Sequence, residues 1–143
     1  AWHTGYRRLG VRHERSVTVF SDEHWEVQDS LLFTKSNPSQ RTFRLHWLLP
    51  DWEWGLDTRS DGVELRLRSP HGWLKVLLSS DSPGADFSLL RAGEVLHGNS
   101  QASPTSGWFS PTYGQKIPAL SCVLQVTSQN DVKFSTHFIF PNS

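Results

Sequence analysis

The chain has 143 residues, and its 14 lysines and arginines balance its 14 aspartates and glutamates, so the formal net charge is zero. Without a field of one sign over the whole chain, we expect neither nucleic acid nor an anionic membrane surface as a partner. Apolar runs of only a few residues are far shorter than the roughly 20 needed to cross a bilayer, and the length predicts one domain over residues 1–143.

Alternation of apolar and polar residues predicts strands along most of the chain, and no segment has a convincing helical pattern. In chain order, a hairpin pairs 16–20 with 25–33 around a turn at 21–24, and a loop at 34–40 follows. The clearest strand is 41–49. One face of that strand carries its larger apolar residues, Phe43, Leu45, Trp47 and Leu49.

Three further hairpins are predicted by pairs of alternating segments that flank a short turn. Their strands are 63–68 with 73–78, 89–91 with 94–96, and 120–126 with 132–140. A Ser-, Pro- and Thr-rich loop at 98–107 lacks an apolar pattern. Short strands at regular spacing predict an all-β fold, an antiparallel β-sandwich.

The polar residues that could support catalysis or bind a metal show no recognised spacing. The seven histidines lack the short local spacing that metal sites use, so we expect no metal and no cofactor. No serine lies in a Gly-x-Ser-x-Gly elbow, so we also expect no catalytic residue. Cys122 is the single cysteine, which excludes an internal disulfide, and its strand position beside Leu120 and Leu124 predicts a buried thiol.

A basic stretch near the start of the chain contains Arg7, Arg8, Arg12 and Arg15. Arginine makes bidentate contacts with carboxylates and sulfates, the charged groups of acidic polysaccharides, so Arg7, Arg8 and Arg12 are candidate binding residues. The favoured alternative is a solvated sheet face whose arginines pair across strands with acidic residues. Those acidic residues are Glu14, Glu23 and Glu26.

Seven tryptophans are unusual in a chain of this length. Trp52 and Trp54 are two residues apart in an extended segment, so they should point the same way, beside carboxylates that could bind sugar hydroxyls. They are candidates for a carbohydrate platform, and the alternative is a strand edge that covers the core. Three other tryptophans are predicted to be core anchors, namely Trp25, Trp47 and Trp73.

Several short motifs resemble the C-terminal β domain of heparinase II/III-like polysaccharide lyases. They are His3-Thr4-Gly5-Tyr6-Arg7-Arg8-Leu9-Gly10, His13-Glu14-Arg15, Trp25-Glu26-Val27-Gln28-Asp29, 44–50, 107–114 and 135–138. The resemblance implies a parent enzyme that cleaves uronic-acid polysaccharides by β-elimination, with its catalytic tyrosine and histidine in an α-helical toroid and in upstream motifs. Those motifs are absent here, so the chain alone is expected to be inactive.

The resemblance, together with a start at Ala1 and the lack of methionine, predicts an excised C-terminal domain. Its expected partners are the catalytic domain of the same chain and an acidic polysaccharide. The resemblance also implies a periplasmic or secreted location. Two alternatives remain, a free-standing carbohydrate-binding module and a purely structural or dimerisation domain.

Overall fold

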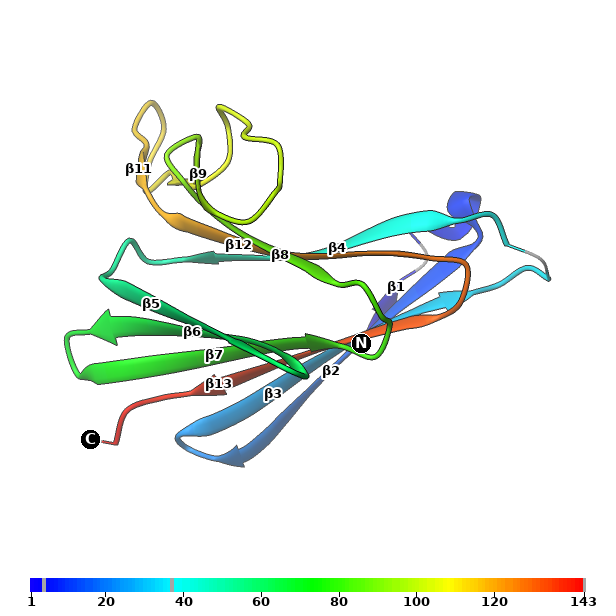
Figure 1. The fold of residues 1–143 in the computed structure, drawn as a ribbon, viewed down its shortest axis with the longest axis horizontal. Coiled ribbons are helices and arrows are strands. Elements are labelled where there is room, and N and C mark those ends of the chain that lie inside the picture. Colours follow the sequence, from blue (N-terminus) through cyan, green and yellow to red (C-terminus); the bar gives the residue numbers. More distant parts are fainter. Residues whose placement is uncertain (4, 37, 143) are drawn as a thin grey trace.

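Two antiparallel β-sheets pack face to face in the computed structural model, which describes residues 1–3, 5–36 and 38–142 (Figure 1). The larger sheet has seven strands in the order β1-β2-β3-β13-β7-β6-β5, and the smaller has four in the order β4-β12-β8-β9. The predicted all-β antiparallel sandwich is therefore confirmed. Among the described residues, no helix is long and apolar enough to span a membrane.

The strands follow the alternating segments of the sequence. The larger sheet contains β1 (Trp2–His3), β2 (Val11–Ser21), β3 (His24–Phe33), β13 (Val132–Ile139), β7 (Gly72–Ser80), β6 (Gly62–Ser69) and β5 (Trp54–Arg59). The smaller sheet contains β4 (Arg41–Leu49), β12 (Leu120–Ser128), β8 (Asp86–Arg91) and β9 (Glu94–His97). A separate pair joins β10 (Trp108–Phe109) to β11 (Ile117–Pro118), and one short 3-10 helix, η1 (Arg7–Leu9), precedes β2.

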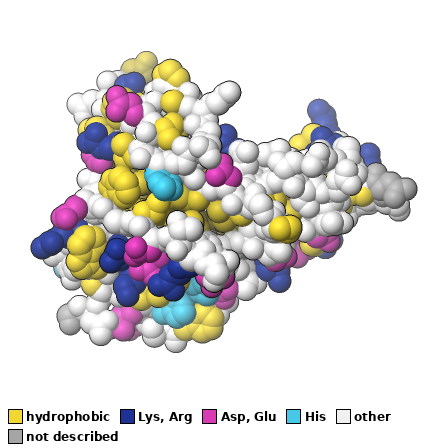
Figure 2. Space-filling model, in the orientation of Figure 1, with side chains coloured by type: hydrophobic (Ala, Val, Ile, Leu, Met, Phe, Trp, Pro, Cys, Tyr) yellow, Lys and Arg dark blue, Asp and Glu magenta, His cyan; other side chains and the backbone are white. Residues whose placement is uncertain are grey.

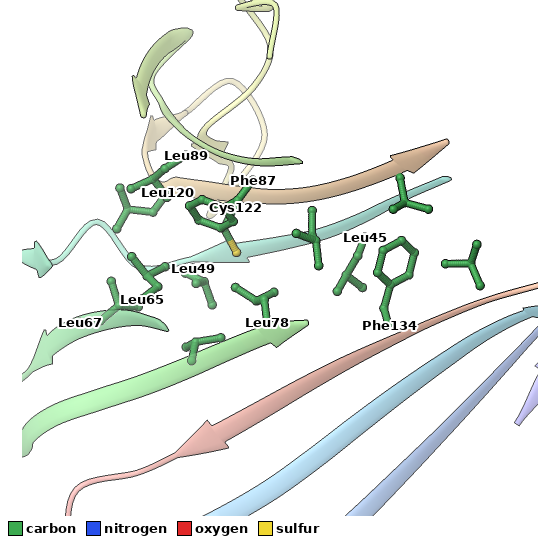
Figure 3. Close-up of a cluster of buried hydrophobic side chains, with 14 of the residues drawn as sticks. Leu45, Leu49, Leu65, Leu67, Leu78, Phe87, Leu89, Leu120, Cys122 and Phe134 are labelled. Atoms are coloured by element: carbon green, nitrogen blue, oxygen red, sulfur yellow. The ribbon is translucent and has the colours of Figure 1, made fainter. Parts of the chain in front are cut away.

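The core lies between the two sheets, where the apolar side of each strand faces its counterpart. Hydrophobic side chains remain visible at the surface between the two layers in Figure 2. Deeper in the interface, Leu45 and Cys122 of the smaller sheet approach Leu78 and Phe134 of the larger one (Figure 3). Period-2 patterning thus identifies the buried face of most strands.

Three predicted hairpins form as expected, but the fourth does not. β2 pairs with β3, β6 with β7, and β8 with β9. The predicted pairing of 120–126 with 132–140 is wrong, because β12 pairs with β4 and β8 while β13 pairs with β3 and β7. The turn at 128–131 therefore carries the chain from one sheet to the other. Alternation of apolar and polar residues shows which side of a strand is buried. It cannot distinguish a hairpin from an arch between two sheets, because each strand has one buried side in both arrangements.

The segment after β9 is a loop, as predicted, and it packs against the smaller sheet. Gly107 has a φ of 74°, and its carbonyl accepts hydrogen bonds from the Ala92 and Ala119 amides at 2.9 Å each. A left-handed residue suits glycine, and a Cβ here would lie 2.7 Å from the backbone of Arg91. The loop also hydrogen-bonds through the Ser100 amide to Ser88 on the outer face of that sheet, which contributes to the burial of this face.

Only one of the three tryptophans predicted as core anchors packs in the interior. Trp47 is half-buried against Phe138, with ring centroids 5.2 Å apart. Trp25 and Trp73 are each 42% exposed, so that prediction is wrong for both. Trp73 lies on the outer face of β7 under Arg68, and Trp25 lies on part of the larger sheet that the smaller sheet leaves uncovered.

Cys122 is buried on β12, as the sequence predicted. Burial raises the pKa of its thiol to about 12, because the thiolate would lose its hydration in the core. We expect no reaction of the folded protein with a thiol reagent at neutral pH, and complete reaction in denaturant. A chromogenic disulfide reagent measures both, and rapid labelling of the native chain would contradict the buried assignment.

Candidate functional site

The larger sheet extends past the smaller one at β2 and β3, which lie at the bottom of Figure 1, and leaves part of its inner face open. Val17 pairs with Val27, and Val19 pairs with Trp25. Val27 is buried, whereas Val17 and Val19 are each 56% exposed. We call Val17, Val19 and Trp25 the open face. It is an apolar surface that continues the core, and among the described residues no second layer buries it.

A buried ion cluster borders the open face. The Asp29 carboxylate is only 4% exposed and accepts two bonds from Arg15, from Nε to Oδ1 at 2.7 Å and from Nη2 to Oδ2 at 2.9 Å. His13 donates from Nε2 to the same Oδ1 at 2.6 Å. The guanidinium of Arg15 also lies 5.1 Å from the ring centre of Trp47 on the opposite sheet. The charge of Asp29 is therefore compensated where β2, β3 and β4 meet.

Hydrogen bonds fix the tautomers of the two histidines in this cluster. The Gly5 amide donates to His3 Nδ1 at 3.1 Å, so the hydrogen of a neutral His3 is on Nε2. That hydrogen points at His13 Nδ1, 2.9 Å away, which leaves the His13 hydrogen on Nε2, facing Asp29. Every ring nitrogen is thus occupied. The cluster anchors β1 to the sheet and presents no free lone pair that could act as a general base.

A basic groove lies between η1 and β4. It has a volume of about 290 Å³ and a largely apolar floor that includes Leu9 and Phe43. Arg41, Arg44 and Tyr6 also line it, and among the described residues no carboxylate does. The Nε of Arg41 is buried there without a hydrogen-bond partner among the described residues. The guanidinium groups of Arg41 and Arg44 face no carboxylate among the described residues of the groove, so an anionic group could pair with them.

The predicted basic residues divide between two places. Arg7 and Arg8 are exposed on η1, the turn whose neighbours line the basic groove, and Figure 2 shows basic side chains at this end of the molecule. Arg12 lies on the outer face of β2 and pairs with Glu14 at 2.8 Å. Arginine pairing with acidic residues across strands was the alternative prediction. Arg12 instead pairs with Glu14 of its own strand, whereas Arg15 pairs across strands, with Asp29. Arg41 and Arg44 could not be identified from the sequence, because only the fold brings β4 beside η1.

Trp52 and Trp54 are half-buried, and both pack against the core. Trp52 lines a groove of about 510 Å³ with Phe109, whereas Trp54 belongs to β5 and is not part of that lining. Arg91 binds both oxygens of Asp51, at 2.6 and 2.7 Å, and this hydrogen bonding lowers the pKa of Asp51. One of the carboxylates expected to receive sugar hydroxyls is therefore occupied by an arginine, whereas Glu53 is 67% exposed. Sugar binding by this tryptophan pair stays a prediction.

A cleft of about 610 Å³ lies where the turns of the two sheets diverge, and the sequence had not indicated it. Its lining includes Asp61, Asp81 and Asp86, with Arg59 as the cation. Arg59 is already paired with Glu64, so the cleft is acidic and unsuited to an anionic polymer. Among the described residues, no group of three or more His, Cys, Asp or Glu side chains could hold a metal ion.

Comparison with known proteins places this sandwich in a family of C-terminal domains. The family described as "Heparinase II/III-like, C-terminal" matches residues 1–136, and the chain belongs to this family. The suspected resemblance is therefore confirmed. No curated protein matches the sequence.

Two solved structures share the fold. A heparinase III with methylated lysines has a TM-score of 0.68 and 16% identity, over 96% of this chain and 18% of that one. A mutant of the heparan sulfate lyase HepC from Pedobacter heparinus has a TM-score of 0.65 and 12% identity, over 99% of this chain and 20% of that one. The chain thus spans about a fifth of the length of these lyases.

Proposed function

We propose that the chain is the C-terminal domain of a polysaccharide lyase and supports the catalytic region by packing against it through the open face. The observation that carries this proposal is the exposure of Val17, Val19 and Trp25 on a sheet face that elsewhere forms the core. Contiguous apolar surface of this kind marks an interaction site. The occupant is the rest of the same protein, because similar lyase chains are about five times longer than this one.

The neighbouring edge of β2 is consistent with a covered position. Residues 16–21 carry no charge, and among the described residues the ladder of β1 reaches β2 at Glu14 and His13, while Ala1 bonds to the Arg15 backbone. Exposed, uncharged, apolar edges promote unwanted strand pairing, so natural proteins usually cover them. A catalytic region packed over the open face would protect this edge too.

The supporting role predicts an effect that appears only in the full-length protein. In the complete reading frame, Val17→Lys with Val19→Lys is expected to lower the melting temperature and lyase activity, because two charges would enter the interface. Thr18→Lys is the matched control, since Thr18 lies on the other face of the same strand. In the isolated domain, all these side chains are solvated and neither change should matter. Equal losses from both variants in the full-length protein would argue against docking through the open face.

The isolated chain is expected to show no lyase activity. The hydrogen-bonded His3–His13–Asp29 chain offers no free base, and the catalytic motifs that the family resemblance implies are missing. The measurement is the ultraviolet absorbance of the unsaturated product, with heparin and alginate as substrates. Turnover that survives repeated purification would show that catalytic residues lie within residues 1–143.

Contact with an anionic polysaccharide is a second proposed role, and the basic groove favours it. Arg41→Gln with Arg44→Gln is expected to weaken heparin binding by tenfold or more, since a hydrogen bond to a charged group contributes about 1.5 kcal/mol. Arg12→Gln, which removes an exposed and paired arginine, should leave affinity nearly unchanged. Fluorescence titration measures the affinities.

The same titration tests the alternatives. A neutral glycan that binds saturably, and no longer binds after Trp52→Ala with Trp54→Ala, would favour a carbohydrate-binding module. Equal losses of heparin affinity in the Arg12 variant and in the Arg41 with Arg44 variant would exclude a specific role for the groove. If no glycan binds saturably, both binding roles are excluded and only the supporting role remains.

A further inference from the structure

His24 and His137 meet on the outer face of the larger sheet. They belong to the neighbouring strands β3 and β13, where His137 pairs with Glu26 and His24 pairs with Ile139. The His24 Nε2 and the His137 Nδ1 are 3.1 Å apart. The two residues are separated by 113 positions in the chain, so no local spacing in the sequence could indicate the pair.

The spacing of these two nitrogens suits a shared metal ion. Zn–N bonds of about 2.05 Å at a tetrahedral angle place two ligand nitrogens about 3.3 Å apart. The observed 3.1 Å is within a few tenths of an ångström of that spacing. A metal ion could replace the single hydrogen that the two rings share once both rings rotate, because the nitrogens now point at each other in a hydrogen bond and not at a common point.

A carboxylate and an aromatic ring flank the two histidines. Glu26 Oε1 lies 3.7 Å from His137 Nε2, the nitrogen that faces away from His24, and Gln28 holds this carboxylate with a 2.8 Å hydrogen bond. Metal-binding histidines commonly donate their second N–H to a carboxylate, which here would require a contact shorter than the observed 3.7 Å. Phe20 stacks on His24 with ring centroids 4.8 Å apart. Both histidines are partly exposed, so water can complete the coordination.

The other histidine pair is a poorer metal site despite a similar distance. His3 Nε2 and His13 Nδ1 are 2.9 Å apart, but His3 Nδ1 already accepts the Gly5 amide hydrogen. A neutral imidazole that binds metal through Nε2 carries its hydrogen on Nδ1, where it would oppose that amide. The chain thus supplies its own matched control.

We propose that His24 and His137 form a binding site for one divalent transition metal ion of the Zn²⁺ type, with water as the remaining ligands and Glu26 as the outer hydrogen-bond acceptor. Imidazole nitrogen is a preferred ligand for Zn²⁺, Cu²⁺ and Ni²⁺. The bound ion links β13 to β3 and so stabilises the folded chain. This site is independent of the open face and of the basic groove.

Calorimetric titration of the isolated chain with zinc chloride at neutral pH tests the site. We expect one ion per chain, loss of binding in His24→Gln and in His137→Gln, and full retention in His3→Gln. Glu26→Gln should weaken binding about tenfold, as is typical for loss of an outer carboxylate. Absence of saturable binding, or loss in His3→Gln with retention in His24→Gln, would overturn the proposal.

Thermal unfolding provides a second readout that also checks folding. Zinc at a tenfold excess over its Kd is expected to raise the melting temperature of the unmodified chain and of His3→Gln by about 4 °C, and a chelator should reverse the rise. Circular dichroism without metal establishes that each variant is folded. A zinc-dependent rise of equal size in folded His24→Gln and His137→Gln would likewise overturn the proposal.

Discussion

Replacing Arg15 with leucine is expected to lower the free energy of unfolding by about 3 kcal/mol, because the buried Asp29 carboxylate would lose its cation and two hydrogen bonds. The carboxylate is 4% exposed, whereas the arginine side chain is 40% exposed. Removal of Arg15 is therefore damaging, because the Asp29 carboxylate that stays behind is buried and cannot turn to solvent for a replacement partner. Urea denaturation followed by tryptophan fluorescence measures the loss.

Arg12→Leu is the matched control for this prediction. Arg12 belongs to the same strand, carries the same charge and pairs with Glu14, but both side chains of that pair are largely in water. We expect a change within about 0.5 kcal/mol. In the double variant Arg15→Leu with Asp29→Leu, part of the stability should return, because no buried charge remains. Equal losses from the two arginine variants would show that the Asp29 cluster contributes no more than a surface pair.

The sequence was sufficient for the sheet faces and for the local hairpins. β2 and β3 are joined by a short turn, so their pairing follows from adjacency and alternation together. β12 and β13 are also joined by a short turn, yet they belong to different sheets. Alternation records only that one side of each strand is buried. Pairing with β4 and β3 depends on contacts between distant segments, which the local pattern does not contain.

The candidate sites were less predictable because each one combines distant segments. The basic groove joins η1 to Arg41 and Arg44, and the proposed metal site joins β3 to β13. Asp29 fitted an alternating strand as a polar residue, but its position is on the buried side. A carboxylate at an inward position of a strand was the available signal. It indicates that a cation must lie nearby, although not which arginine supplies it.

Replacing Phe134 with alanine is expected to lower the free energy of unfolding by about 4 kcal/mol, through lost burial and the cavity left behind. Phe134 is 1% exposed on β13, in the layer where the two sheets meet (Figure 3). Tyr113→Ala is the control, because that ring is fully exposed and its removal should change little. Denaturant midpoints measure both, and the reaction of Cys122 with a thiol reagent reports the same unfolding independently.

Phe134 and Asp29 are direct partners across β13 and β3, so the core variant and the ion-cluster variant should not be independent. A cavity at Phe134 lets water or a relaxed backbone approach Asp29, which reduces the cost of leaving that carboxylate without its arginine. We therefore expect Phe134→Ala with Arg15→Leu to cost less than the sum of the two single changes, by about 0.5 kcal/mol or more. Strict additivity would mean that the cluster is insulated from the core.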